Sequence, residues 1–511
     1  MRALLAAVAI AACWVTYLMM RAPRNVGDGH PGLAAPETWL RARSPPLVAP
    51  PARPPVSSKP PPQVLLPPVV EPAPEPSSRV HVVFSTDCSA YQDWQTEVVF
   101  NSALVVGHAG PLTRIASGCG EAERRRLSEL PRVIALGGLF QGARYAALYP
   151  DLFDSRIFVH FTPAFNKDEA SGNTYHFYNK PRGIEHWLAE PGSSASRTEI
   201  VALIDPDFAF LRPLSDEFDR KRELVVISPW TVDDVPRRVE RGVPFGQQYG
   251  LGTHWRRFDR AAICGADSPC VATTEKDAYK FYPVGPPYVA HVDDWRRIAP
   301  VWREFAPRVY AQYPNLLAEM YAYCMAAAHL ELPHVRVNHL MLSNAAVKDE
   351  GWPLVDALPL ALACPADPEA DPPLVARQVA RNHALPAFVH FCQNYRLGDW
   401  MFAKRRVPRE LFVSCDRELL APPPADVWKF RYELQPPGNP CRDEPKRKPL
   451  TNPRIANRTA LSMCLATWHT NAAARHATGV SRRRELVRHP RTRVKLYDIA
   501  THCWKKKTPA R

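Results

Sequence analysis

The run EIVALI at residues 199–204 is the longest continuous β-forming segment of the chain. Because it has no polar face, the strand must be covered on both sides, as a central strand of a parallel sheet is. The run ends at once in Asp205-Pro206-Asp207. The pattern predicts an α/β fold with these two acids at the carboxyl edge of the sheet, where open α/β folds bind ligands.

Further strands and helices follow one another along the same part of the chain. Residues 80–85 are predicted to form a first strand, residues 91–106 a helix with a buried face, and residues 112–115 a second strand. Strand, helix and strand in this order predict parallel pairing with a crossover. Later helices are expected at 184–190, 293–308 and 316–330, and a late strand at 387–391.

Asp205 and Asp207 form a carboxylate pair of the kind that binds Mg²⁺ or Mn²⁺. Such a cation serves reactions whose leaving group is a nucleoside diphosphate, because it neutralises the developing charge. A turn or a helix cap also selects aspartate, so the pair alone leaves both interpretations open. His390 is a candidate third ligand, with a packed core histidine as the alternative. Lys404 is a candidate diphosphate contact, with a solvated basic surface as the alternative.

Glu319 precedes the segment MYAYC in an otherwise apolar helix. A carboxylate among aromatic residues is expected to be paired or functional. The alternative is a first-turn acid that the helix dipole stabilises.

The N-terminal residues differ in composition from the rest. Residues 3–20 carry no charge and nearly reach the length of a membrane-spanning helix. Bulky residues stand where a cleavage site would lie, which favours a signal anchor over a cleaved signal peptide. Of the 56 residues at 21–76, 17 are proline, which favours an extended stalk. The expected division is a signal anchor at 1–20, a disordered stalk at 21–78, an α/β domain at 79–425 and a basic, partly disordered appendage at 426–511.

The positive charge lies at the C-terminal end. Residues 441–511 hold 18 Lys and Arg against 4 Asp and Glu, which accounts for the whole net charge of +14. Because the rest of the chain is balanced and has no zinc-finger or RNP-like pattern, nucleic-acid binding is not expected.

Eleven of the 12 cysteines lie outside the apolar N-terminal segment. No two have the Cys-x-x-Cys spacing of structural zinc sites, so disulfides in an oxidising compartment are expected. Cys264 and Cys270 are close enough for a local bridge. Asn457-Arg458-Thr459 is a glycosylation sequon if this region is lumenal.

Seven segments, in order, resemble the plant and algal family of peptidyl serine α-galactosyltransferases and hydroxyproline O-arabinosyltransferases. They are FSTDCSAYQDWQTEVVFNS (84–102), GPLTRIAS (110–117), NKPRGIEHWL (179–188), ALIDPDFAFLRPL (202–214), DDWRRIAPVW (293–302), AEMYAYCMAAA (318–328) and VHFCQNYRLGDWMFAKR (389–405). The resemblance covers about residues 80–425. Residues 230–282 match it loosely, and 363–384 stand as an insertion.

The resemblance implies a GT-A-like domain with a mixed, mainly parallel sheet, a UDP-sugar donor and Mn²⁺ or Mg²⁺. It implies a Golgi or endoplasmic reticulum membrane protein with a lumenal catalytic domain. The implied reaction moves galactose or arabinose, with retention, to Ser or hydroxyproline of secreted hydroxyproline-rich proteins. The residues carried over by position are Asp205, Asp207 and His390 as metal ligands, Glu319 and Asp207 as catalytic residues, and Asp205, Lys404, Asn179 and Lys180 as donor-binding residues.

A catalytically inactive, lectin-like or scaffolding protein of the secretory pathway is the competing hypothesis. The carboxylate pair argues against it, because such a protein has no reason to keep the pair. The residues leave open which sugar is moved, and whether retention uses a carboxylate nucleophile or front-face attack.

Overall fold

The structure, a computed structural model, describes residues 80–124, 156–218, 236–356, 385–412, 419–424, 426–435 and 446–478. The expected anchor at 1–20 and stalk at 21–78 lie outside these residues, as does the basic tail after residue 478. No helix within the described ranges is long and apolar enough to cross a membrane.

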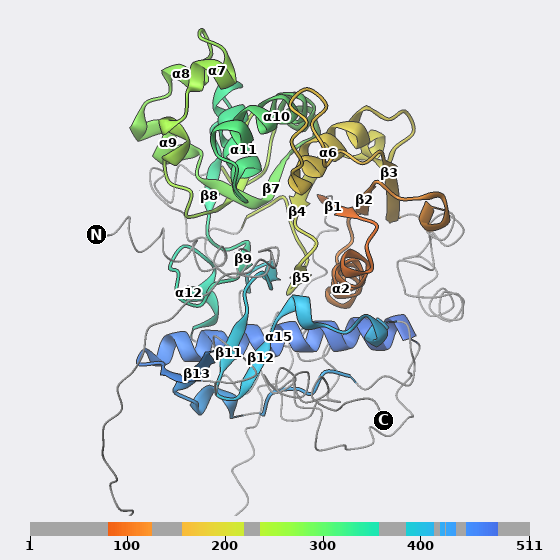
Figure 1. Ribbon diagram of the computed structural model, residues 1–511, viewed down its shortest axis with the longest axis vertical. Coiled ribbons are helices and arrows are strands. Elements are labelled where there is room, and N and C mark those ends of the chain that lie inside the picture. Colours follow the sequence, from red (N-terminus) through yellow and green to blue (C-terminus); the bar gives the residue numbers. More distant parts are fainter. Residues whose placement is uncertain are drawn as a thin grey trace, which may run out of the picture. The chain divides into compact units, whose positions relative to one another are not determined.

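A seven-stranded sheet is the largest sheet of the described residues (Figure 1). Its strands, in spatial order, are β3 (Ile157–Thr162), β2 (Leu112–Ser117), β1 (Val80–Asp87), β4 (Ile200–Ile204), β7 (Val284–His291), β6 (Phe245–Gln248) and β8 (Val335–Val337). β7 runs antiparallel to both of its neighbours, and every other pair in the sheet is parallel. The predicted α/β fold with a mixed, mainly parallel sheet is confirmed.

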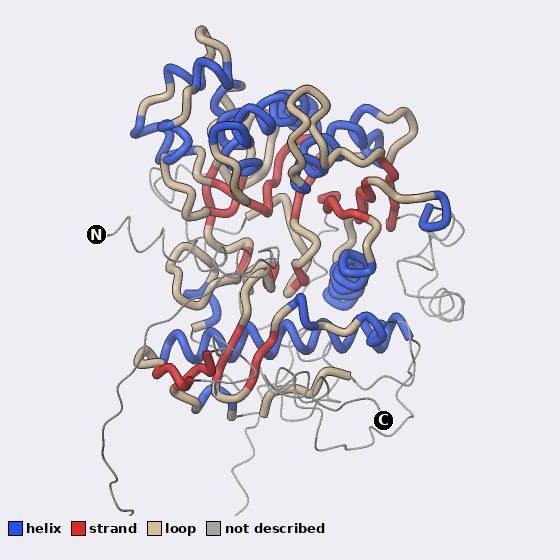
Figure 2. Tube along the Cα trace, viewed as in Figure 1, coloured by secondary structure: helices blue, strands red, loops and turns tan. Residues whose placement is uncertain are grey.

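The helices lie on both sides of the strands (Figure 2). They are α2 (Ala90–Val106), α6 (Asn179–Ala189), α7 (Arg260–Cys264), α8 (Pro269–Ala272), α9 (Glu275–Phe281), α10 (Val292–Gln312), α11 (Ala318–His329), α12 (Trp352–Val355) and α15 (Pro453–Thr478). The smaller sheets contain β5 (Phe208–Phe210), β9 (Met341–Leu342), β10 (Phe388–His390), β11 (Tyr395–Leu397), β12 (Trp400–Phe402), β13 (Tyr432–Gln435) and β14 (Lys446–Pro449). Each strand and helix that the sequence predicted is present, with bounds shifted by a few residues.

Strand β4 is buried on both faces, as its apolar sequence requires. Val201 and Leu203 belong to a hydrophobic cluster with α6, α10 and α11. Ala202 and Ile204 point the other way, into a cluster that includes residues of α2. Figure 1 accordingly shows α2 on the opposite side of the sheet from α6 and α10. Because both faces of β4 are packed, the strand holds Asp205 and Asp207, which follow it, at a defined place at the edge of the sheet.

A three-stranded sheet in the order β5-β10-β9 continues from the carboxyl end of β4. β5 follows the acid pair directly, and β10 pairs antiparallel with it so that His390 lies opposite Phe208. The backbone N–H of Phe391 donates to the carbonyl of Asp207 at 3.0 Å. The register of this small sheet therefore brings the late strand to the acids.

Helix α15 packs against α2 and the β11–β12 hairpin. Its residues Ala460 and Met463 are buried in one cluster with Trp94 of α2. Small alanine side chains allow close approach despite the low apolar density of this segment. The domain boundary expected after residue 425 is therefore not what the structure shows, because residues 453–478 pack within the same core.

Two disulfides join described residues, Cys88–Cys119 and Cys264–Cys270. The second is the local bridge that the sequence suggested. Cys464 of α15 is disulfide-bonded as well. The sequon residue Asn457 is partly buried within α15.

Candidate active site

Asp205, Asp207 and His390 meet where β4 ends. One ligand atom from each, a carboxylate oxygen or an imidazole nitrogen, lies within 4.8 Å of the other two. Asp207 and His390 are buried, whereas the side chain of Asp205 keeps 23% of its surface accessible. The structure thus brings together the three residues that the sequence assigned to a metal, with Asp205 as the most accessible of them.

The imidazole of His390 is held from several sides. Its ring stacks on Phe208 with the centroids 4.2 Å apart and the planes 14° apart. The hydroxyl of Tyr395 donates to the backbone carbonyl of His390 at 2.9 Å. The Nδ1 atom faces the hydroxyl of Tyr249 at 3.5 Å, and Nε2 faces the acids. The orientation of the ring is therefore fixed before any ligand arrives.

Asp207 is contacted by two basic side chains. His390 Nε2 lies 3.2 Å from its Oδ1 atom, and Lys404 Nζ binds its Oδ2 atom. Burial by itself would raise the pKa of Asp207, but the charges of Lys404 and His390 outweigh it, so the pKa lies well below its ordinary range. Burial disfavours the charged form of Lys404, yet Asp207 overcomes this effect and raises the lysine pKa. Asp207 is therefore ionised at every physiological pH.

Lys180 connects the acid pair to helix α11. Its Nζ atom lies 2.7 Å from Asp205 Oδ1 and 2.6 Å from Glu319 Oε1. Burial would lower the pKa of Lys180, but the two carboxylates outweigh it and raise the pKa. Lys180, which lies on α6, therefore holds Asp205 and Glu319 close to each other.

Glu319 is buried in the first turn of α11, so it is both the paired acid and the first-turn acid that the sequence offered as alternatives. Burial raises the pKa of Glu319, and Lys180 opposes that shift. Its backbone N–H donates to the hydroxyl of Tyr175 at 3.3 Å, and its carbonyl accepts from Trp302 Nε1 at 2.7 Å. Its Oε2 atom has no hydrogen-bond partner among the described residues.

Asn179, the first residue of α6, has a structural contact. Its Oδ1 atom accepts the backbone N–H of Phe165 at 2.8 Å, which ties the preceding loop to the helix. Nothing in the structure tests its predicted contact with a donor, which stays a prediction.

The donor atoms of the cluster fit a divalent cation. Two carboxylates and one imidazole are a mixed oxygen and nitrogen set, which Mn²⁺ accepts, while Mg²⁺ prefers oxygen ligands alone. Lys180 contacts Asp205 and Lys404 contacts Asp207, and their positive charges offset the repulsion between the two carboxylates. Three ligands would leave the remaining positions of an octahedral ion for water or substrate oxygens.

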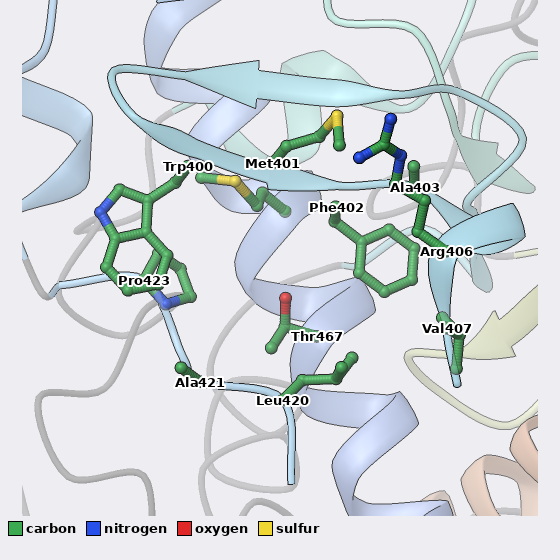
Figure 3. A pocket seen from close by; sticks show the side chains of 11 residues that line it. Trp400, Met401, Phe402, Ala403, Arg406, Val407, Leu420, Ala421, Pro423 and Thr467 are labelled. Atoms are coloured by element: carbon green, nitrogen blue, oxygen red, sulfur yellow. The ribbon is translucent and has the colours of Figure 1, made fainter. Parts of the chain in front are cut away.

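A pocket between β12 and α15 lies apart from this cluster (Figure 3). Its lining includes Trp400, Phe402 and Arg406 on one side and Thr467 of α15 on the other. Its volume of about 20 Å³ is room for roughly one water molecule. None of its lining residues belongs to the acid cluster, so it is no part of the candidate active site.

Two curated proteins are similar to the chain in sequence. The peptidyl serine α-galactosyltransferase of Arabidopsis thaliana is 24% identical over 359 residues, which cover 68% of this chain and 34% of the relative. The Chlamydomonas reinhardtii protein of the same name is 23% identical over 296 residues, which cover 54% of this chain and 33% of the relative. The chain is related to the peptidyl serine α-galactosyltransferases. It spans about a third of the length of these relatives.

No protein-family model matches the chain. Among solved structures, the crystal structure of the galactosyltransferase LgtC with donor and acceptor sugar analogues is 13% identical. That alignment covers 65% of this chain and 94% of LgtC, with a TM-score of 0.31.

Sequence reasoning missed Tyr249, which lies in a segment that matches the galactosyltransferase family only loosely. The residue follows β6, and its hydroxyl lies 3.5 Å from Nδ1 of His390, which is 141 residues further along the chain. No local pattern marks it, because its role depends on the packing of β6 against the small sheet. The two contacts of Lys180 were also not predicted, since α6, β4 and α11 are far apart in the sequence.

Proposed function

We propose that this protein is a metal-assisted glycosyltransferase with a GT-A-like fold, which uses a nucleoside diphosphate sugar as its donor. The observation that carries the proposal is the cluster of Asp205, Asp207 and His390 at the end of the buried strand β4, with Lys404 beside it. The relationship to peptidyl serine α-galactosyltransferases supports it.

In this proposal Asp205, Asp207 and His390 hold Mn²⁺ or Mg²⁺, and the mixed donor set favours Mn²⁺. When bound, the ion neutralises charge on the diphosphate leaving group. Lys404 supplies a second positive charge at the same place, as a point-charge contact to a phosphate oxygen. Lys180 keeps Asp205 in place for the ion through the contact at 2.7 Å.

Glu319 is the proposed acid near the reacting carbon of the sugar. Its Oε1 atom is held by Lys180, and its buried Oε2 atom, which has no hydrogen-bond partner among the described residues, is the one proposed to meet a bound substrate. In the transfer, the bond from the sugar carbon to the diphosphate breaks, a bond to the acceptor oxygen forms, and the hydroxyl proton leaves with the diphosphate. Retention with a carboxylate nucleophile and retention by front-face attack both fit this arrangement.

The proposed donor is a UDP-sugar carrying galactose or arabinose, and the proposed acceptor is Ser or hydroxyproline in a hydroxyproline-rich polypeptide. Both relatives are named peptidyl serine α-galactosyltransferase, which supports serine as the acceptor and galactose as the sugar. The proposed location is the lumen of the Golgi or endoplasmic reticulum, with residues 3–20 as the membrane anchor. The disulfides Cys88–Cys119 and Cys264–Cys270 support an oxidising compartment.

The test is a donor screen with the purified full-length chain and a Ser- and hydroxyproline-rich peptide, which scores UDP release and the mass of the product. We expect turnover with one UDP-sugar, its loss in a chelator and its return with Mn²⁺. Turnover that persists in the chelator contradicts the metal role. A chain that gains no thermal stability from UDP plus Mn²⁺ and turns over no donor supports the scaffolding alternative instead.

A further inference from the structure

Tyr249 is locked in place beside the acid cluster by backbone geometry. Its N–H donates to the carbonyl of Pro283 at 2.9 Å, directly after β6. The ring occupies space that Gly285 of β7 leaves open, because a Cβ at that glycine would lie only 2.3 Å from Cδ2 of Tyr249. The position of the phenol ring is therefore determined by the main sheet, whereas His390 comes from the small one.

The hydroxyl of Tyr249 has two neighbours with different hydrogen-bonding abilities. Met341 Sδ lies 3.8 Å away and can only accept, while His390 Nδ1 lies 3.5 Å away and can donate or accept. The hydroxyl oxygen carries one proton and two lone pairs. If that proton goes to Met341, a lone pair on the oxygen accepts the Nδ1 proton of His390.

This arrangement decides which nitrogen of the imidazole is open to an ion. A neutral histidine carries one proton, and a partner at one ring nitrogen determines the state of the other. With the proton on Nδ1, the lone pair of Nε2 points toward Asp207 Oδ1, 3.2 Å away in the acid cluster. With the proton on Nε2, that lone pair is lost to the cluster.

We propose that Tyr249 is a positioning residue that holds the proton of His390 on Nδ1, so that Nε2 is the nitrogen offered to a divalent cation. This inference rests on the metal-assisted function proposed above. Tyr249 would then contact a metal ligand without contacting the metal, and it lies outside the seven segments that resemble the galactosyltransferase family. Such outer partners fix the tautomer and orientation of metal-binding histidines, and losing one typically costs 10–100-fold in metal affinity.

The experiment measures Mn²⁺ affinity directly, from the electron paramagnetic resonance signal of free Mn²⁺ during titration of the purified protein. We expect Tyr249→Phe to weaken Mn²⁺ binding about 10-fold or more. The matched control is Tyr323→Phe, which removes another Tyr–His hydrogen bond, the buried one from Tyr323 to His334 at 2.9 Å, outside the acid cluster. This control is expected to bind Mn²⁺ as the unaltered protein does.

A second readout follows the proton itself. Nitrogen-15 spectra of histidine-labelled protein with Mg²⁺ are expected to show the His390 proton on Nδ1, and to lose that signature in Tyr249→Phe. Met341→Leu removes the acceptor of the hydroxyl proton and is expected to weaken Mn²⁺ binding too. It provides the test if the phenylalanine variant does not fold.

Three results would overturn the proposal. Equal Mn²⁺ affinity in Tyr249→Phe and the unaltered protein removes the role of Tyr249 but leaves the metal site standing. Equal weakening in the Tyr323→Phe control shows a general loss of stability. An unaltered protein that binds no Mn²⁺ removes the metal role and this inference together.

Discussion

The ammonium of Lys180 lies 2.6 Å from Oε1 of Glu319, and both side chains are buried. The same ammonium also contacts Asp205, so helices α6 and α11 are joined through the end of β4. A lysine between two acids keeps both carboxylates together in a space where they would otherwise repel. The candidate active site is thus organised around this lysine as well as around the acids.

Replacing Lys180 with methionine should strongly destabilise the protein, because Glu319 is left buried and unpaired. Removing one partner of a buried ion pair costs about 3–5 kcal/mol. The double variant Lys180→Met, Glu319→Gln should recover part of this loss, because it removes the orphaned charge. The measurement is the free energy of unfolding in urea. A loss below about 1 kcal/mol in the single variant would fit an exposed ion pair instead.

Asp207→Asn should abolish stabilisation by UDP plus Mn²⁺, because the asparagine removes a ligand charge. For the unaltered protein, a ligand at 100 times its Kd adds about 2.7 kcal/mol. The shift of the thermal midpoint on adding UDP and Mn²⁺ measures this effect. Asp216→Asn is the control, since Asp216 is also a buried acid but faces Arg238 outside the cluster. An undiminished shift in Asp207→Asn would exclude a ligand role for this residue.

Glu350 should make stability fall as the pH rises through the acid range. Burial raises its pKa to about 7, against the hydrogen bonds from Ser343 and Asn344. Because the folded state holds the proton more tightly than the unfolded state, stability is lost between the ordinary pKa and pH 7. The loss is of the order of 3 kcal/mol.

The Glu350→Gln variant isolates this contribution, because the other titrating groups are the same in both proteins. The difference in unfolding free energy between the variant and the unaltered protein should change in favour of the variant as the pH rises from 5 to 7. A difference that stays constant over this interval would mean that Glu350 is ionised throughout.

Arg458→Leu should destabilise the junction between α15 and the rest of the core. The guanidinium of Arg458 makes two bonds to Asp356, at 2.8 and 2.6 Å, and lies over Trp352 with its central carbon 5.0 Å from the ring centroid. Hydrogen bonds to charged groups are worth about 1.5–3 kcal/mol, and we expect a loss in this range. Arg454→Leu, at an exposed position one turn earlier, should change stability by less than about 0.5 kcal/mol. Equal effects of the two changes would contradict the role given to Arg458.

The sequence predicts the part of the site that local patterns determine. The apolar run before Asp205 predicts both the buried strand and the position of the acids at its end. A strand without polar residues has to be buried on both faces, so it ends where the polar residues begin. The residues alone left His390 open between a metal ligand and a packed core histidine, since its position depends on the pairing of β10 with β5. The family resemblance favoured the ligand. Tyr249 and the double contact of Lys180 could not be predicted, because they arise where segments distant in sequence pack together.

The C-terminal helix shows the same limit from the other side. Its basic composition and low apolar density suggested an appendage, whereas its small alanine side chains allow close packing against α2. The number of apolar residues in a helix indicates how much surface the helix can bury. It does not show whether another segment of the chain has a complementary surface.

The packing of α15 against α2 also has a practical meaning for anyone who shortens this protein. A fragment that ends at the prolines near residue 423 would lack α15, and Trp94 with its apolar neighbours would be exposed to water. Such a fragment is expected to aggregate during expression.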